Sequence, residues 1–216
     1  MSKHCIIIQG PIHDQQRMVK SWEGFNTIYS TWDDEKQKIK CSKNVICNKK
    51  PENSGYKNFN YQLVTSLAGL KKAKKKGFEF SVKWRSDYIP SNPTNLFKIF
   101  DKEKLNFIAW SSHGGGYLVD YFFAGKTEYL LKIFEKMQAL EKDYPRYFPE
   151  KKLTIATKEL VEEKSIKPNY LLNKFDESNY CTFIRKGKDF DSVNTVWKDD
   201  EYWQSDSTKK GKWGWE

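Results

Sequence analysis

Residues 78–87, FEFSVKWRSD, decide the fold. Apolar and polar residues alternate from Phe78 to Trp84, which is the period of a β-strand. A charged Arg-Ser-Asp triplet follows, so the carboxylate of Asp87 is expected at or just beyond the C-terminal end of that strand. Open α/β sheets bind ligands outside the carboxyl ends of their strands. The stretch therefore predicts one strand of a sheet and, at its end, one wall of a ligand site.

The residues before this stretch have the order of a strand–helix–strand unit. Residues 5–11, CIIIQGP, form a β-branched apolar run that ends in Gly-Pro, as a buried parallel strand does where it meets a loop. Two more strands are predicted over Thr27–Trp32 and Asn44–Asn48, and residues 14–24 between the first two have helical character. We expect the loop after the first strand to lie beside the Arg-Ser-Asp triplet.

A long helix is predicted over Asn58–Lys76, with Gly77 as its C-terminal stop. Lysines gather in its last turns, where they suit the negative pole of the helix dipole. The same lysines would also concentrate anions near the surface. The sequence leaves both explanations open.

The second half of the chain repeats the alternation of strands and helices. Strands are predicted over 106–110 and 119–125, and helices over 126–140 and 154–163. A chain of 216 residues is long enough to cover both faces of one sheet. We therefore predict an α/β fold in a single domain over residues 1–216.

Composition narrows the class of protein. Apolar residues make up only 38% of the chain, but 14 Phe, 12 Tyr and 8 Trp supply much area per residue, so a folded core is expected. The four cysteines lack CxxC spacing, which favours a reducing, cytoplasmic setting over a zinc cluster or a disulfide framework. No run approaches the roughly 18 apolar residues of a membrane span, so we expect a soluble chain whose basic surface leaves peripheral membrane contact open.

The net charge and the absence of four common motifs narrow the class of protein further. Lys and Arg outnumber Asp and Glu by 38 to 28, and a net charge of +10 concentrates nucleotide phosphates, nucleic acid or acidic glycans. The GxGxxG, P-loop, HExxH and GxSxG motifs are absent from the sequence. The sequence therefore contains no motif that would indicate a dinucleotide oxidoreductase, a P-loop kinase, a zinc protease or an α/β-hydrolase.

Two aspartates are candidate catalytic groups. Asp87, beside Arg85, can help hold a divalent cation or the diphosphate that the cation neutralises. A strand-end salt bridge or a turn before Pro90 explains the same residues without a ligand. Asp120 stands in an apolar, aromatic strand, where an unpaired charge is costly. It is therefore either partnered or kept as a base that takes a proton from a hydroxyl.

Five stretches, in this order, resemble one known family. They are IIIQGPI (6–12), YSTW (29–32), NFNYQLVTSLAGLKKAKKKG (58–77), VKWRSD (82–87) and LVDYFFAGKTEYLLKIF (118–134). The chain is similar over about residues 6–160 to the WavE-type lipopolysaccharide-synthesis family of GT-A-like glycosyltransferases. The helix with Asn-x-x-Gln followed by Lys-x-Arg-Ser-Asp is the most specific part of this resemblance.

The resemblance implies a GT-A-like, Rossmann-like fold, in which a mixed, mainly parallel sheet is flanked by helices. It implies a nucleotide-sugar-binding half, residues 1–105, and an acceptor-side half with a C-terminal tail, residues 106–216. Asp87 occupies the place of the final acid in the metal-binding Asp-x-Asp signature of that fold, and Arg85 replaces the first acid. We expect Asp87 to hold Mn²⁺ or Mg²⁺, although Arg85 can neutralise phosphate charge directly.

The resemblance also implies a donor site and a mechanism. Asp120 is the candidate base, while Asp87 with the metal, or Arg85, stabilises the departing diphosphate of a UDP- or GDP-sugar. One displacement without a covalent intermediate inverts the anomeric carbon, and the acceptor is a glycan hydroxyl in a bacterium or a virus-infected host cell. The donor-binding residues are expected to be Gln9, Gly10, Pro11, Trp32, Asn60, Ser66, Lys83, Arg85 and Ser86.

Two other functions stay open on the sequence. A basic nucleic-acid-binding module explains the net charge and the aromatic residues through phosphate contacts and base stacking, but it leaves the ordered motifs unexplained. A nucleotidyltransferase or nucleotide-binding protein would use the same strand ends without transferring sugar. Sugar found on an acceptor, rather than released pyrophosphate, would separate the last alternative from a glycosyltransferase.

Overall fold

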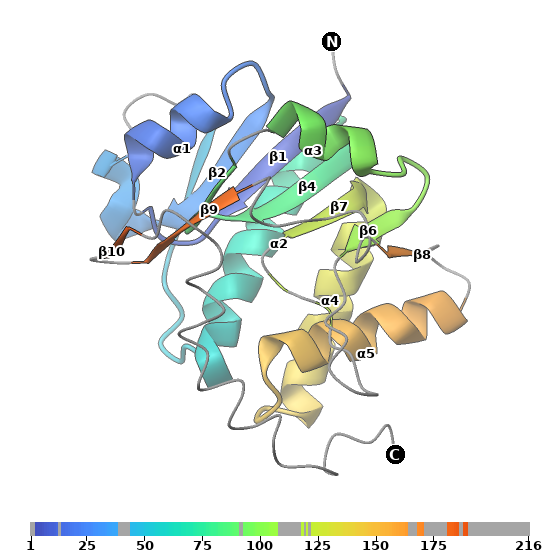
Figure 1. Ribbon diagram of the computed structural model, residues 1–216. Helices are drawn as coiled ribbons and strands as arrows, with labels where there is room; N and C mark the ends of the chain where they lie inside the picture. Colours follow the sequence, from blue (N-terminus) through green and yellow to red (C-terminus); the bar gives the residue numbers. More distant parts are fainter. Residues whose placement is uncertain are drawn as a thin grey trace.

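A seven-stranded sheet in the order β3-β2-β1-β4-β7-β6-β8 forms the middle of the molecule (Figure 1). The computed structural model describes residues 3–12, 14–38, 44–90, 93–107, 118, 120, 122–163, 168–170, 181–185 and 188–189. The strands of this sheet are β1 (His4–Gln9), β2 (Thr27–Trp32), β3 (Val45–Asn48), β4 (Phe80–Arg85), β6 (Leu105–Phe107), β7 (Phe122–Lys126) and β8 (Pro168–Tyr170).

The sheet is mixed and mainly parallel. β1 pairs in parallel with both β2 and β4, and β3 extends the parallel set beyond β2. β7 runs antiparallel to β4 and to β6, and β8 is parallel to β6. In the centre, Ile7 lies between Ile28 and Lys83 of the neighbouring strands. The carboxyl ends of β1, β2 and β4 therefore share one edge of the sheet.

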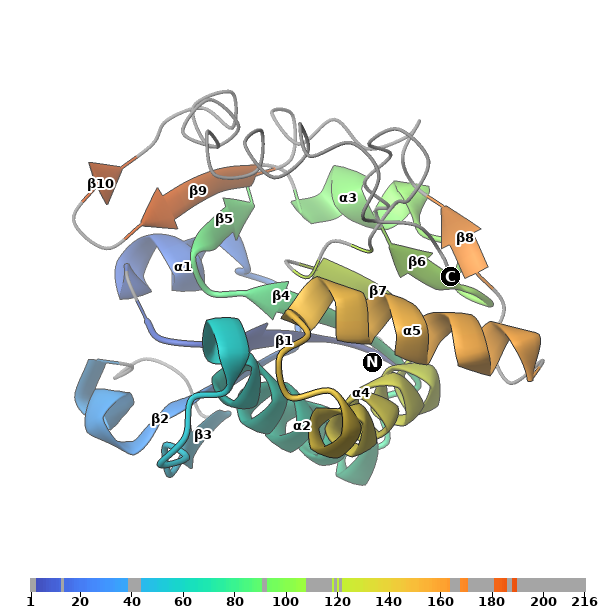
Figure 2. The same cartoon turned by 90° about the horizontal axis from the view of Figure 1, so that it is seen from below.

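Helices cover both faces of the sheet (Figure 2). α1 (Gln15–Ser21) and α3 (Pro93–Ile99) lie on one face, together with a smaller sheet of β5 (Tyr88–Pro90), β9 (Cys181–Arg185) and β10 (Lys188–Asp189). α2 (Phe59–Lys75), α4 (Thr127–Asp143) and α5 (Pro149–Glu162) lie on the other face. Two short 3₁₀ turns, at Asp33–Lys38 and Tyr56–Asn58, complete the described elements.

Alternate residues of β1 face two separate apolar cores. Ile6 and Ile8 pack with the α1 side, whereas Cys5 and Ile7 pack with the residues of α2, α4 and α5. A strand buried on both faces is a continuous apolar run, which explains the composition of residues 5–8. Gly69 lets α2 approach closely, since a Cβ atom there would stand 2.3 Å from Ile7 Cγ2.

Most of the predicted elements are confirmed, and several others were not anticipated. The strand over Thr27–Trp32 has the predicted bounds, and the long helix ends one residue inside the prediction on each side. The final predicted helix begins earlier, at Pro149. β5, α3, β9 and β10 are among the unanticipated elements. Residues 108–110 of one predicted strand lie outside the described part of the chain.

Within the described ranges, no helix has both the length and the apolar character that a bilayer crossing requires.

Candidate functional site

The loop after β1 and the turn after β4 lie side by side, as the sequence predicts. The backbone N–H of Ser86 donates to the carbonyl of Gln9 at 3.0 Å, and the Ser86 hydroxyl donates to the carbonyl of Pro11. Gly10 has a φ of +111°, and a Cβ atom there would lie 2.9 Å from Ser86 Oγ. Only glycine adopts this backbone without strain while leaving room for Ser86.

Glu35 fixes this loop from the side of β2. Its Oε2 accepts hydrogen bonds from the backbone N–H of Ile12 at 2.7 Å and from the Thr31 hydroxyl at 2.8 Å. Sequence reasoning missed Glu35, because an acid in the first turn of a short helix is explained by the helix dipole alone.

Arg85 is the charged centre of the site. Its Nε and Nη2 donate to Asp87 Oδ1 at 2.9 Å and to Asp87 Oδ2 at 2.5 Å, and its Nη1 donates to Asp120 Oδ1 at 3.1 Å. Gln62, from the first turns of α2, donates to Asp120 Oδ2 at 2.9 Å. The structure thus joins two aspartates that are distant in sequence through one guanidinium.

Lys83 lies on β4, two residues before Arg85, and is completely buried. Its Nζ donates to the backbone carbonyl of Asp120. Burial lowers the pKa of Lys83 to about 8, because the nearby charge of Asp120 offsets only part of the desolvation. Lys83 therefore holds the segment of Asp120 against β4.

Glu150, in the first turn of α5, is near enough to this group for the charges of Asp120, Arg85 and Lys83 to act on its carboxyl. The Thr154 hydroxyl donates to the carbonyl of Glu150 at 2.7 Å and accepts from the backbone N–H of Leu118 at 2.9 Å, which ties α5 to the segment that carries Asp120. Burial, reinforced by the negative charge of Asp120, raises the pKa of Glu150 to about 7. We call Gln62, Lys83, Arg85, Asp87, Asp120 and Glu150 the Arg85 cluster.

At Asp120 and Arg85, neighbouring charges outweigh the effect of burial on the pKa. Burial alone would raise the pKa of Asp120, but the charges of Arg85 and Lys83, with hydrogen bonds from Arg85 and Gln62, lower it below its usual value. Burial would likewise lower the pKa of Arg85, but Asp87 and Asp120 raise it instead. At neutral pH, Arg85 is therefore a firmly held cation.

The remaining predicted donor residues lie on β1, β2 and α2. The side-chain oxygen of Gln9 accepts a hydrogen bond from the Thr65 hydroxyl of α2 at 2.8 Å. Trp32 is only 2% exposed, with its edge against the Tyr61 ring, which leaves little ring surface for a ligand. Asn60 bonds to the loop that precedes α2, and Ser66 is buried with a hydroxyl that has no hydrogen-bond partner among the described residues.

The donor set does not fit a divalent cation. Such a cation takes carboxylate oxygens as ligands, but both oxygens of Asp87 accept N–H groups of Arg85, so a metal ion there would face a guanidinium. The described part of the chain contains no group of three or more His, Cys, Asp or Glu side chains arranged around a metal position. We derive no step through a metal, and the Mn²⁺ or Mg²⁺ site at Asp87 stays a prediction.

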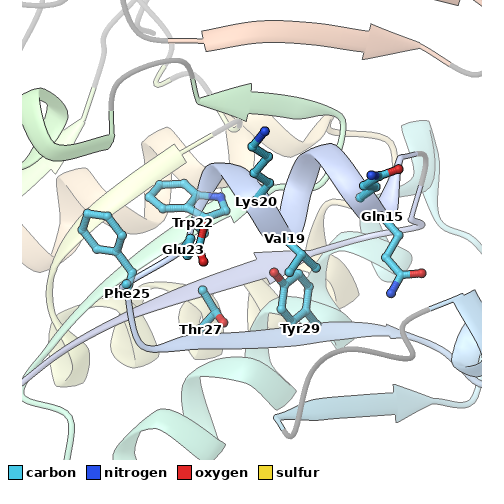
Figure 3. A pocket seen from close by; sticks show the side chains of 10 residues that line it. Gln15, Val19, Lys20, Trp22, Glu23, Phe25, Thr27 and Tyr29 are labelled. Atoms are coloured by element: carbon cyan, nitrogen blue, oxygen red, sulfur yellow. The ribbon is translucent and has the colours of Figure 1, made fainter.

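A hollow of about 570 Å³ lies elsewhere, between α1 and β2 (Figure 3). Figure 3 shows Val19 of α1 above Tyr29 of β2, with Gln15 at one end and Phe25 at the other. It shares no residue with the Arg85 cluster or with the predicted donor residues. Lys20 and Glu23 are the two charged residues that line the hollow, whereas the Arg85 cluster joins several charged side chains, so we place the candidate site at the Arg85 cluster.

No family model and no curated protein matches the sequence.

Proposed function

We propose that the chain is a glycosyltransferase of GT-A-like fold, related to the WavE-type family, that takes a sugar from a nucleotide-sugar donor. The observation that carries the proposal is the position of Arg85. In the order β3-β2-β1-β4, the chain adds β2 and β3 on one side of β1 and then crosses back to add β4 on the other side, which makes the carboxyl end between β1 and β4 a topological switch point. Ligands of open α/β sheets bind at such points. The loop after Gln9 and the Arg85 cluster both stand there.

The chemistry of Arg85 suits a diphosphate. A guanidinium has five N–H donors, and the three hydrogen bonds to carboxylate oxygens described above leave two donors for phosphate oxygens. The Arg85 side chain is 30% exposed, so a ligand can reach it from solvent. A planar cation held in place by two carboxylates is also a preorganised partner for charge that develops on a leaving group.

The proposed reaction is a single displacement at the anomeric carbon. The acceptor oxygen forms a bond to this carbon, the bond to the diphosphate oxygen breaks, and the nucleoside diphosphate leaves with the electron pair. Arg85 stabilises its charge, and a carboxylate takes the proton of the acceptor hydroxyl. Besides Asp87, the cluster offers Asp120 and Glu150 for that proton.

A thermal-shift screen tests donor binding. The unfolding temperature is measured with UDP-, GDP-, CMP- and dTDP-sugars, each with and without Mn²⁺, because a ligand that binds only the native state raises this temperature. We expect a shift with one nucleotide class, and we expect Arg85→Gln to abolish it. Arg146→Gln, at an exposed arginine of the α4–α5 connection, is the matched control and keeps the shift.

Two results would count against the proposal. If no nucleotide sugar shifts the wild type, the site does not bind the proposed donor. If a donor is bound but pyrophosphate, rather than sugar on an acceptor, is the product, the chain is a nucleotidyltransferase.

A further inference from the structure

Lysines gather at the C-terminal end of α2, away from the Arg85 cluster. They are Lys71, Lys72, Lys74, Lys75 and Lys76, which we call the α2 lysine patch. All of them except Lys72 are exposed. α2 leads from the carboxyl end of β3 to the amino end of β4, and these strands are parallel to β1 and β2, so α2 ends at the amino edge of the sheet. The α2 lysine patch and the candidate site therefore stand at opposite ends of one helix.

The helix dipole accounts for only part of the charge of the α2 lysine patch. The C-terminal end of a helix carries roughly half of an elementary charge, so a single lysine in the last turn is enough to balance it. Two of the lysines also have local contacts. Lys72 Nζ donates to the carbonyl of Val45 at 3.4 Å, and Lys76 Nζ donates to Asn44 Oδ1 at 2.8 Å. Both acceptors are neutral, so the patch keeps its positive charge.

Acids at the amino edge of the sheet do not neutralise this charge. No Asp or Glu occurs between residues 53 and 78, which include all of α2. Three acids that follow are each paired with a lysine outside the patch, in the pairs Lys3–Glu79, Lys104–Asp101 and Lys126–Glu103. Glu128, in the first turn of α4, acts on Lys126 as well. Within the described ranges, no ion pair includes a lysine of the α2 lysine patch.

We propose that the α2 lysine patch is a docking surface for an anionic lipid bilayer. Clusters of about four to eight basic residues on a helix bind the negative surface of such a membrane electrostatically. Lysine suits this partner, because its ammonium group is a compact, hydrated point charge that needs no fixed geometry for each contact.

Docking through the patch leaves the candidate site accessible. Gln62, which bonds to Asp120 of the Arg85 cluster, lies in the first turns of α2, whereas the patch occupies its last turns. A helix of 17 residues is about 25 Å long. The membrane contact and the Arg85 cluster are therefore separate, and the inference does not depend on the proposed transferase function.

The composition of the patch favours a membrane over nucleic acid. Single-stranded nucleic acid binds in grooves where aromatic rings stack on the bases. The large apolar side chains that are exposed in the described part of the chain are Tyr56, before the first turn of α2, and Tyr144, after α4, so neither belongs to the patch. Arginine, which binds phosphate groups through paired N–H donors, is absent from α2.

Vesicle binding of the full chain tests the docking surface. The patch variant carries Lys71→Gln, Lys74→Gln and Lys75→Gln, and the control carries Lys132→Gln, Lys142→Gln and Lys158→Gln. The control removes three exposed lysines of α4 and α5, so both variants have the same net charge. Each protein is sedimented with phosphatidylcholine vesicles that contain either no phosphatidylglycerol or about 30% of it. We expect the wild type to bind only the anionic vesicles, the patch variant to bind them about 10²-fold more weakly, and the control to stay within about threefold of the wild type.

Two further measurements separate charge from structure. Binding should be lost at about 1 M salt, where the Debye length is roughly 3 Å. A variant with Lys71→Arg, Lys74→Arg and Lys75→Arg keeps the charge and should bind within about threefold of the wild type. If the lysines only balance the helix dipole, the patch variant unfolds at a lower temperature but binds anionic vesicles as the wild type does, and the proposal is overturned.

Three other results would also overturn the proposal. The wild type might as well be tested on neutral vesicles alone if it binds both kinds equally, because charge would then not drive binding. Equal losses in the patch variant and the control would assign the effect to net charge rather than to the patch. A single-stranded oligonucleotide that displaces the wild type from the vesicles, and that the patch variant no longer binds, would identify a nucleic-acid surface instead. In each case the proposed transferase function stands, because the patch contains no member of the Arg85 cluster.

Discussion

In the part of the chain that the structure describes, two lysines are completely buried, and their surroundings differ. Lys152 of α5 is enclosed by the carboxylate of Glu141 and the ring of Phe59, whose centroid lies 4.0 Å from Nζ. One cation meets one anion and one ring there. Lys83 of β4 instead donates to a backbone carbonyl, in a cluster where two cations face three carboxylates.

The difference teaches that a buried charge does not by itself indicate a functional site. The Lys152 group is closed, since its cation and anion are paired with each other and a ring covers the cation, which is what a structural ion pair between helices requires. The Arg85 cluster is unbalanced; burial lowers the pKa of Lys83, and burial together with the charge of Asp120 raises the pKa of Glu150. Perturbed titration beside a sheet's switch point is the pattern expected of a catalytic site.

The largest effect should come from Arg85. Arg85→Gln should lower kcat/KM for the donor by about 10²–10³, because a preorganised cation at the leaving group is lost. Lys152→Met should change kcat/KM by less than about threefold, because its cluster holds no substrate. Steady-state kinetics of the two variants measure this contrast directly. Equal losses of kcat/KM would contradict the distinction between the Arg85 cluster and the Lys152 ion pair.

The next effect is on stability against pH. Folded Glu150 keeps its proton up to about pH 7, whereas an unperturbed glutamate loses it near 4.5, so the native state binds more protons between these values. Stability should therefore fall as pH rises through this window, by up to about 3 kcal/mol for the single group. Urea unfolding at several pH values should show a flatter profile for Glu150→Gln than for the wild type; identical profiles would contradict the raised pKa.

Lys152→Met should act on stability alone. It leaves Glu141 without its cation, but the Glu141 side chain is 20% exposed and can be hydrated, so we expect a loss of about 1–3 kcal/mol of unfolding free energy. Lys158→Met, at an exposed pair on the same helix, should cost less than about 0.5 kcal/mol. Urea unfolding separates them, and a loss of donor binding in Lys152→Met would place Lys152 in the functional site.

A further effect concerns the loop beside Arg85. Gly10→Ala should destabilise the fold by about 1–3 kcal/mol and weaken donor binding, because it adds a clash with Ser86 Oγ to a strained backbone. Gly24→Ala is the matched control: its φ is also positive, at +83°, but a Cβ atom would meet nothing within 4 Å. It should cost less and leave donor binding intact, and equal effects of the two variants would show that the contact with Ser86 is unimportant.

Much of the fold could be predicted because its signals are local. The apolar run of β1 and the alternation of β4 each lie within a few residues, and the period of α2 extends over several turns. β5 has only three residues, of which the last is Pro90, and α3 has seven, so neither is long enough to show a period. These two elements were missed for that reason.

The site was predicted only in part because its assembly is long-range. The Arg85–Asp87 pair is local and was found, but the bond between Gln62 and Asp120 joins residues 58 positions apart. Glu150 gave no signal, because an acid beside the opening proline of a helix is already explained by the dipole. That it comes near Arg85 and Asp120 depends on how α5 packs against α4 and the segment of Leu118.

The most direct test of the central claim is to follow sugar and nucleotide together. Wild type and Arg85→Gln are incubated with each nucleotide sugar and a set of glycan acceptors, and both products are measured by mass spectrometry. The account predicts that one donor class yields glycosylated acceptor and free nucleoside diphosphate in equal amounts with the wild type, and that Arg85→Gln forms both about 10²–10³ times more slowly. Absence of both products from the wild type with every donor, or equal yields from the two proteins, would contradict it.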